Sequence, residues 1–429
     1  MKKMDYQNVK GTQDFLPEAE VIRRKIRRTL EDVFIQYGCK PIETPILNYS
    51  ELLSSKYGGG AEILEEMYSL TDRGERDLAL RYDLTIPFAK VVAMNPTLRM
   101  PFKRYEIGKV FRDGPIKTGR FREFTQCDVD VVGVESQIAE AELMEMAIEA
   151  FKKLELEVVI QFNNRKLLVG LLELFDTPIE KINEVVLTLD KLEKIGLEGV
   201  ESELKEKDLS IKTVNLIKEL MENALNENIQ YFERYSKDNK TLQEGIQELK
   251  ELSSYLKYLN LEGKCKFNPF LARGLEIYTG TIYEIFLSNQ TIKSSIGSGG
   301  RYDNAIRGLI GTDQTFSTVG ISFGLDVIYT AMNLLDKVFT DESNVDYYVI
   351  PLNAQKEGLV VASYLRQKGN NVELEMGNKK LSKALDRANK ENIRQVVIIG
   401  ENEVKNNHYK IKDMVSGDEK IESFIFNTN

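Results

Sequence analysis

The strongest constraint on the fold comes from two runs that carry polar side chains at every second position. The runs Lys103 to Arg112 and Glu123 to Val132 flank a polar loop and predict a pair of antiparallel strands. Alternate residues of a strand share one face. One face would therefore carry Arg104, Glu106, Gly108, Arg112, Phe124, Gln126, Asp128 and Asp130. Because a core cannot hold so many unpaired charges, we expect this face to be either solvated or the floor of a binding site.

The rest of the first 335 residues predicts an α+β fold interrupted by helices. Glu18 to Tyr37 reads as a helix with one apolar stripe, formed by Ile22, Ile26, Leu30 and Phe34. From about residue 165 to 258 amphipathic helical patterns dominate, and strand-like character returns around Phe267. We interpret this interruption as a helical module inserted into an α+β domain.

After a polar linker at residues 339–345, the C-terminal segment alternates strand and helix patterns. The predicted elements are, in order, a strand at Tyr347–Ile350, a helix at Leu359–Lys368, a strand at Val372–Leu374, a helix at Leu381–Lys390 and a strand at Val396–Ile399. This βαβαβ order predicts a small α/β domain with a mainly parallel sheet. From Pro351 onward there are 13 basic and 11 acidic residues, so this segment is +2 on a chain of net charge −9.

Composition excludes several reaction classes. The single histidine, His408, cannot form a zinc site that needs two imidazoles, and its polar surroundings favour a surface position. Three distant cysteines predict no disulfide framework and a reducing compartment. No stretch approaches the roughly 18 apolar residues of a membrane span, and residues 1–14 lack the apolar region of a signal peptide. We therefore expect a cytoplasmic protein with no membrane association.

Four segments have the composition of ligand-binding loops. The loop 113–122 contains Lys117, Arg120 and Arg122, and we interpret it as a mobile phosphate-gripping hairpin rather than a tight turn. Residues 272–281 place an arginine beside a glycine, and residues 296–303 contain a glycine-rich run that lets a backbone approach a ligand closely. The strand 320–326 has glycines four residues apart and is expected to face a flat group such as a purine. No phosphate-binding GxxxxGK[ST] or GxGxxG motif is present.

The order and spacing of these segments resemble those of histidyl-tRNA synthetases, which are class II aminoacyl-tRNA synthetases, over nearly the full length. Lys10–Pro17 resembles the opening of the family, and the segment ending at Pro45 resembles motif 1, the dimer-forming element. The other matching segments are Phe111–Asp128 (motif 2), Thr188–Leu192 (a helical signature), Arg273–Gly280 and Ser298–Asp303 (the two histidine-specific motifs), and the C-terminal βαβαβ unit (anticodon-binding domain).

The resemblance implies an α+β class II core built on an antiparallel sheet, with a helical insertion and a small α/β anticodon-binding domain. The implied boundaries are 1–164 and 261–338 for the two parts of the catalytic core, 165–260 for the insertion and 346–429 for the anticodon-binding domain. It also implies a homodimer that pairs through the motif 1 helix and strand, whose apolar stripe is expected to need a partner.

The implied activity is ligation of L-histidine to tRNA(His) with ATP and Mg²⁺, through a histidyl-adenylate. Alignment and charge neutralisation would supply the catalysis. Arg112 and Arg273 would be the catalytic cations at the α-phosphate. The implied histidine-binding residues are Asp83, Leu84, Thr85, Arg112, Gln126, Asp130, Arg273, Ile277, Tyr278 and Tyr302. Those implied for ATP are Arg112, Arg120, Phe124 and Gly324, and no protein side chain is assigned to the metal.

Two departures from the family pattern leave alternatives open. Motif 3 normally ends in an acidic residue followed by an arginine that contacts the γ-phosphate, whereas here the pair is Asp326-Val327. The first histidine motif usually carries two tyrosines, and this chain has Ile277-Tyr278. The alternatives are a non-catalytic relative, either the histidine-sensing regulatory subunit of ATP phosphoribosyltransferase or a tRNA-binding protein with weakened ATP chemistry. Decayed histidine motifs and a missing C-terminal domain would favour the regulatory subunit.

Overall fold

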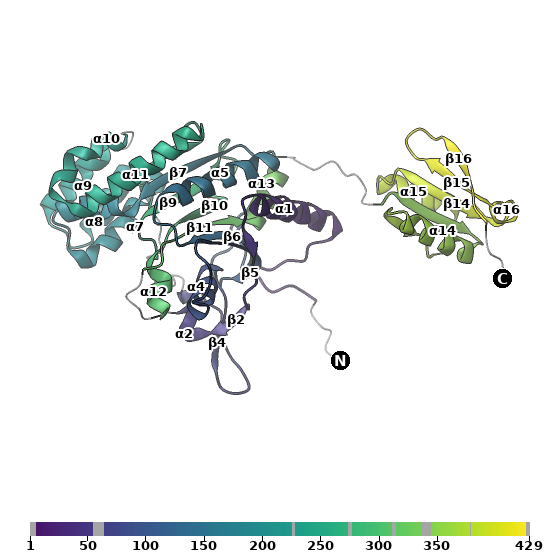
Figure 1. The fold of residues 1–429 in the computed structure, drawn as a ribbon, viewed down its shortest axis with the longest axis horizontal. Coiled ribbons are helices and arrows are strands. Elements are labelled where there is room, and N and C mark those ends of the chain that lie inside the picture. Colours follow the sequence, from purple (N-terminus) through teal and green to yellow (C-terminus); the bar gives the residue numbers. More distant parts are fainter. Residues whose placement is uncertain are drawn as a thin grey trace. The chain divides into compact units, whose positions relative to one another are not determined.

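The computed structural model describes residues 6–54, 64–224, 228–272, 277–310, 315–335, 345–377 and 379–425. The chain divides into two compact units, one within residues 1–337 and one within residues 338–429 (Figure 1). In the described residues no helix is both long and apolar enough to cross a membrane.

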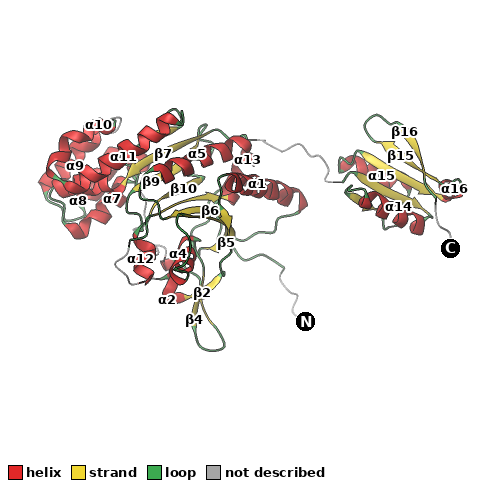
Figure 2. Cartoon of the chain, in the orientation of Figure 1, coloured by secondary structure: helices red, strands yellow, loops and turns green. Residues whose placement is uncertain are grey.

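An eight-stranded sheet forms the centre of the first unit (Figure 2). Its strands, in spatial order, are β1 (Lys40–Pro41), β5 (Phe102–Phe111), β6 (Glu123–Val132), β11 (Thr318–Gly324), β10 (Gly297–Arg301), β9 (Thr281–Leu287), β7 (Val158–Asn164) and β8 (Cys265–Phe267). All pairings are antiparallel except β1 with β5 and β7 with β8. The predicted α+β fold with an antiparallel core is confirmed.

The register of β5 and β6 confirms that the two predicted polar rows coincide. Arg104 lies opposite Asp130, and Gly108 lies opposite Gln126. Strand β11 pairs with the other edge of β6 and sets Ser322 opposite Asp128. Side chains of three neighbouring strands therefore meet on one face of the sheet.

Three helices, α1 (Pro17–Gln36), α5 (Ile138–Lys153) and α13 (Leu325–Leu334), pack together against the sheet (Figure 1). The apolar stripe of α1 faces this layer: Ile26, Leu30 and Phe34 are fully buried, and the Phe34 ring lies 5.5 Å from that of Phe323. The expectation that this stripe needs a partner subunit is therefore wrong, because the chain covers the stripe itself.

A smaller three-stranded sheet and short helices cover the polar face of the large sheet, on the side away from α1, α5 and α13 (Figure 1). Its strands, in order, are β2 (Leu47–Tyr49), β4 (Asp77–Leu80) and β3 (Ser69–Thr71), and the nearby helices are α2 (Ser50–Leu53), α4 (Thr85–Met94) and α12 (Asn304–Ile310). Tyr82, Ile86 and Phe88 build the core between these elements. The turn that precedes α4 is thereby held beside β5 and β6.

The segment between β7 and β8 is helical, as its sequence pattern predicts. It contains α6 (Arg165–Leu174), η1 (Ile179–Lys181), α7 (Ile182–Leu189), α8 (Leu192–Lys205), α9 (Ile211–Ala224), α10 (Ile229–Phe232), η2 (Glu233–Asp238) and α11 (Lys240–Tyr258). Helices α6 and α11 approach closely because both have glycine at the contact: a Cβ at Gly170 would lie 2.6 Å from Leu242, and one at Gly245 would lie 2.8 Å from the backbone of Leu167. The boundaries 165 and 260 of an inserted domain stay a prediction.

The second unit contains a five-stranded sheet in the order β13 (Val372–Leu374), β12 (Tyr347–Leu352), β14 (Gln395–Gly400), β15 (His408–Asp413) and β16 (Glu419–Ser423). Its helices are α14 (Gln355–Gln367), α15 (Leu381–Lys390) and α16 (Glu401–Lys405). The predicted βαβαβ core is confirmed, but the sheet is mixed, because β15 and β16 add two antiparallel pairings. The turn between them contains Gly417 at φ 79°, a left-handed conformation that favours glycine.

Candidate active site

Around Arg104 the polar face of β5 and β6 is buried, and most of its charges are paired within the chain rather than solvated. Arg104 has no exposed surface, and its Nη2 lies 2.5 Å from an oxygen of Asp130. Its Nη1 lies 3.6 Å from Glu106, whose other oxygen pairs with Arg81 at 2.8 Å. The guanidinium of Arg104 also lies 4.3 Å from the centre of the Phe88 ring. This face therefore forms a rigid, charge-paired floor, which leaves the binding-site interpretation of the pattern.

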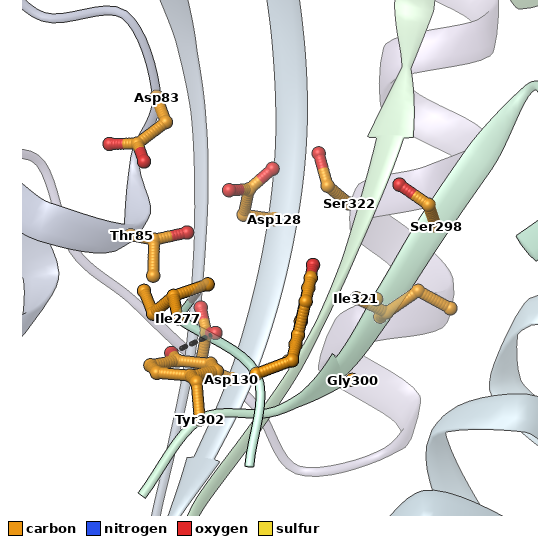
Figure 3. A pocket seen from close by; sticks show the side chains of 13 residues that line it. Asp83, Thr85, Asp128, Asp130, Ile277, Ser298, Gly300, Tyr302, Ile321 and Ser322 are labelled. Atoms are coloured by element: carbon orange, nitrogen blue, oxygen red, sulfur yellow. Dashed lines mark hydrogen bonds between the residues drawn. The ribbon is translucent and has the colours of Figure 1, made fainter. Parts of the chain in front are cut away.

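A pocket with an empty volume of about 380 Å³ opens above this floor (Figure 3). The turn before α4, strands β6, β10 and β11, and the segment at 277–278 form its walls. The structure brings six predicted residues together here: Asp83, Thr85, Asp130, Ile277, Tyr278 and Tyr302.

Tyr302 and Asp130 close the bottom of the pocket through a short hydrogen bond from the phenol to the carboxylate (Figure 3). Glycine is required beneath them: a Cβ at Gly320 would lie 1.9 Å from Asp130 Oδ1, and one at Gly300 would lie 2.8 Å from the ring of Tyr278. These glycines make room for neighbouring side chains. This corrects the expectation that the glycine at 320 faces a flat ligand.

Burial dominates the electrostatics of the pocket carboxylates. It raises the pKa of Asp83 to about 6, against the opposing hydrogen bond from the Ile86 backbone N–H and the charge of Arg112. It raises the pKa of Asp128 to about 8, and it also raises that of Asp130, although Arg104 favours both charged forms. The pocket lining contains three carboxylates and no cationic side chain. A ligand with a positive charge would favour their ionised forms, which burial disfavours.

Other predicted residues lie around the pocket rather than in its walls. Leu84 is fully buried. Its backbone carbonyl accepts a 3.2 Å hydrogen bond from Arg104, and its side chain is not part of the pocket wall. Gln126 donates to the Ser322 hydroxyl at 3.0 Å. Arg112 donates from Nε to the Tyr82 carbonyl at 2.9 Å, and its guanidinium lies 5.3 Å from the Phe124 ring centre. Arg273 lies outside the described residues.

The tip of the loop between β5 and β6 is a tight turn, whereas a mobile phosphate-gripping hairpin was expected in place of a tight turn. Lys117 and Arg120 exchange two backbone hydrogen bonds of 3.2 and 2.9 Å, and Gly119 adopts φ 72°. The exposed Arg120 pairs with Glu66 at 3.2 Å. The turn is compact because glycine at position 119 allows the left-handed conformation that closes it.

The pair Asp326-Val327 has a structural role. Asp326 is buried and accepts hydrogen bonds from Arg23 of α1 at 2.5 Å and from the Thr125 N–H of β6 at 2.6 Å. Val327 fills the space between two glycines: a Cβ at Gly119 would lie 3.0 Å from its Cγ2, and one at Gly324 would lie 2.8 Å from its Cγ1. The apolar side chain therefore packs against both the loop tip and the end of β11.

Three wall residues with polar side chains, Asp128, Ser298 and Ser322, have no ligand assigned to them from the sequence. Asp128 lies between Gln126 and Asp130 in the alternating pattern, so its facing was predictable. Ser298 and Ser322 become neighbours through the pairing of β10 with β11, a long-range register that a local pattern does not reveal.

Comparisons with known proteins agree with this geometry. Residues 11–328 match the family model described as histidyl-tRNA synthetase, and residues 346–425 match that of an anticodon binding domain. The chain is 59% identical over 426 residues to histidine–tRNA ligase 2 of Shouchella clausii, covering 99% of this chain and 100% of that protein. It is 55% identical over 417 residues to histidine–tRNA ligase 1 of Bacillus cereus, covering 97% of each.

Two solved structures share the fold. The histidyl-tRNA synthetase of Nostoc sp. PCC 7120 superposes with a TM-score of 0.82 at 29% identity, covering 98% of this chain and 97% of that one. A protein from Bacillus halodurans C, described as an ATP phosphoribosyltransferase regulatory subunit/histidyl-tRNA synthetase, gives a TM-score of 0.76 at 21% identity, covering 93% of this chain and 99% of that one. The second likeness concerns the fold alone.

Proposed function

The chain belongs to the histidyl-tRNA synthetase family, and on that premise we propose that it is a histidine–tRNA ligase. It would activate L-histidine with ATP to histidyl-adenylate and diphosphate, and then transfer histidine to the 3′ end of tRNA(His). The observation that carries this proposal is the 59% identity along the whole chain to a histidine–tRNA ligase. The test is aminoacylation: purified protein should charge tRNA(His) with histidine in the presence of ATP and Mg²⁺. Failure to charge it, where a known ligase succeeds on the same tRNA, would overturn the proposal.

The pocket above the β5–β6 floor would bind histidine. Asp83, Thr85, Gln126 and Asp130 would surround its ammonium group, and Tyr278 and Tyr302 would bound the imidazole. The surplus of carboxylates supports a cationic ligand. Ile277 would line the side wall, while Leu84 would contribute through the backbone that positions Asp83 and Arg104.

Arg112 and Arg273 would act on the reacting groups. Adenylate formation joins a carboxylate to the α-phosphate, so cations that neutralise charge there lower the barrier. Arg112 lies over Phe124, which would stack on the adenine, and Gly324 would leave room beside it. Arg120 would reach the outer phosphates after it leaves Glu66.

Mg²⁺ would enter with ATP. The described residues contain no group of three or more His, Cys, Asp or Glu side chains placed to bind a metal ion. Phosphate oxygens are ordinary Mg²⁺ ligands, and the ion would neutralise part of the triphosphate charge. The chain's own contribution would then come from its arginines.

The regulatory-subunit alternative is disfavoured. Two ligases match this chain at 59% and 55% identity, whereas the structure that carries the regulatory description matches at 21%. The C-terminal unit, which that reading expects to be missing, is present and matches the anticodon-binding model. Aminoacylation and histidine-dependent pyrophosphate exchange would distinguish the ligase from a tRNA-binding protein with weakened ATP chemistry.

The C-terminal unit would bind the anticodon arm of tRNA. The sequence suggests a basic surface made by Lys379, Lys380, Lys383, Arg387, Lys390 and Arg394. Two of these six side chains are engaged in ion pairs. Arg387 pairs with Glu373 at 2.6 Å and with Glu391 at 2.7 Å, and Arg394 pairs with Asp413 at 3.1 Å. Lys383 and Lys390 of α15 are exposed and would supply the charge that faces phosphate.

We propose a homodimer in the cytoplasm. Apolar side chains beside the small sheet are exposed in the single chain: Tyr49 by 59%, Leu47 by 46% and Ile46 by 41%. They directly follow the segment that resembles motif 1 and would be covered by a second copy. The three cysteines are free and buried, which fits a reducing compartment. Sedimentation at micromolar concentration should show a dimer, and a stable monomer would contradict the proposal.

Val327 is expected to limit the affinity for ATP. Replacing it with arginine should lower the KM for ATP in pyrophosphate exchange by about 10- to 100-fold, because one charge-assisted hydrogen bond is worth roughly 1.5–3 kcal/mol. Val327→Met is the matched control, since it lengthens the side chain and adds no charge. An unchanged KM in Val327→Arg, or an equal change in both variants, would show that packing against Gly119 and Gly324 decides the affinity instead.

A further inference from the structure

Asp128 is a pocket residue that the roles given above leave unused. It lies on β6, is 4% exposed, and projects into the pocket between two groups of polar residues (Figure 3). Asp83 and Thr85 lie on one side of it, and Ser298 and Ser322 lie on the other (Figure 3). A carboxylate in this position faces any ligand that fills the pocket.

The hydrogen bonds of Asp128 leave one oxygen unused. Its carboxylate is bonded to the Ser322 hydroxyl, whose oxygen in turn accepts a 3.0 Å hydrogen bond from Gln126. Its Oδ1 is buried and has no hydrogen-bond partner. A buried polar oxygen without a hydrogen-bond partner is costly, and native structures rarely keep one without a functional reason.

No cation of the described residues pairs with Asp128. Arg104, the nearest candidate on the floor, pairs with Asp130 at 2.5 Å and with Glu106 at 3.6 Å. Arg81 is held by Glu106. The groups that surround the Asp128 carboxylate are Asp83 before α4, Arg104 and Glu106 on β5, Gln126 and Asp130 on β6, Tyr278, and Ser298 and Ser322 on β10 and β11. Carboxylates outnumber arginines in this set.

We propose that Asp128 binds the ammonium group of the amino-acid substrate through Oδ1. This inference rests on the proposed function and adds a substrate-binding residue to it. The ammonium group is charged at neutral pH, whereas an imidazole of ordinary pKa is mostly neutral. It also has three N–H donors, enough for Asp83, Gln126 and Asp128 together. Asp130, which is hydrogen-bonded to Tyr302, would then face the imidazole rather than the ammonium group.

Binding should release a proton. Burial and the neighbouring carboxylates Asp130 and Asp83 raise the pKa of Asp128 to about 8, so near neutral pH the group is largely protonated. A bound ammonium group favours the charged form and lowers this pKa. The affinity for histidine should therefore increase as the pH rises from 6 to 8.

The experiment is calorimetric titration of the wild-type protein and the Asp128→Asn variant with three compounds. Histidine and histidinol carry the ammonium group, and imidazolepropionate lacks it. Asp128→Asn should bind histidine and histidinol about 10- to 100-fold more weakly, and imidazolepropionate as the wild type does. Glu123→Gln is the control: it makes the same change on the same strand, at a partly exposed carboxylate paired with Lys109.

Unchanged histidine affinity in Asp128→Asn would overturn the inference. An equal loss for all three compounds would overturn the ammonium assignment, because it would place Asp128 at the imidazole. Titration of the wild type in two buffers of different ionisation enthalpy should show proton release near pH 7, and no release would contradict the inference even if the variant did not fold. Failure of the proposed function is distinguishable, since the wild type would then show no histidine-dependent pyrophosphate exchange.

Discussion

The Arg104→Met variant is expected to lose about 3–5 kcal/mol in the free energy of unfolding, the usual cost of removing one partner of a buried ion pair. Arg104 is fully buried and lies between Asp130 and Glu106, so methionine would leave Asp130 charged and unpaired inside the sheet. Methionine keeps much of the side-chain volume, and the loss would therefore report the charge rather than a cavity. Urea unfolding monitored by circular dichroism measures this difference in the free energy of unfolding between the variant and the wild type.

Arg76→Met is the control for this result. Arg76 also forms an ion pair, with Asp72 at 2.6 Å, but its side chain is 62% exposed. Exposed pairs contribute at most about 1 kcal/mol. Adding Asp130→Asn to Arg104→Met should restore part of the lost stability, because it removes the stranded charge. If Arg104→Met were as stable as Arg76→Met, the polar face would not be a charge-paired floor.

The Arg112→Ala variant is expected to form histidyl-adenylate about 100- to 1000-fold more slowly, the usual effect of removing one preorganised donor. The Arg112 guanidinium is held by the Tyr82 carbonyl at 2.9 Å and lies over Phe124, so its position is set before the substrates arrive. Single-turnover formation of the adenylate at saturating histidine and ATP measures the chemical step.

Arg112→Lys separates charge from geometry. Lysine keeps the positive charge and lacks the planar fork that suits phosphate and carboxylate, so its rate should fall between those of the wild type and Arg112→Ala. Arg99→Ala, a change at an exposed arginine, should leave the rate unchanged. Adenylate formation at the wild-type rate in Arg112→Ala would show that Arg112 does not act on the reacting groups.

Local patterns predict much of this fold because they fix which side of an element is buried. The period of the α1 stripe predicts its buried face, and the alternation in β5 and β6 predicts the polar row that the register confirms. The same alternation places Arg104 and Arg112 on one side and cannot separate their roles. Arg104 lies opposite Asp130 deep in the sheet, whereas Arg112 follows the end of β5 and lies at the rim.

Local sequence patterns do not predict features that depend on residues far apart in the chain. The hydrogen bonding of Asp128 depends on Ser322, which lies opposite it on β11 and 194 positions later in the chain. Ser322 bonds to the carboxylate, and Oδ1 is left without a hydrogen-bond partner. The packing of Val327 depends on where the tip of a distant loop folds, and the pattern alone shows only that an expected arginine is missing. Strand β15 alternates apolar Tyr409 and Ile411 with Lys410 and Lys412, so its pattern favours a strand, whereas β16 contains a single apolar residue, Ile421, and carries no such signal.

Histidine-dependent exchange of radioactive pyrophosphate into ATP tests the central claim most directly. It needs only the amino acid, ATP and Mg²⁺, and it reports adenylate formation without tRNA. A histidine–tRNA ligase should exchange label with histidine, should not do so without it, and should lose the exchange in Arg112→Ala. No exchange with histidine, in a folded protein that still binds histidine or tRNA, would contradict the account and leave a non-catalytic relative of the family.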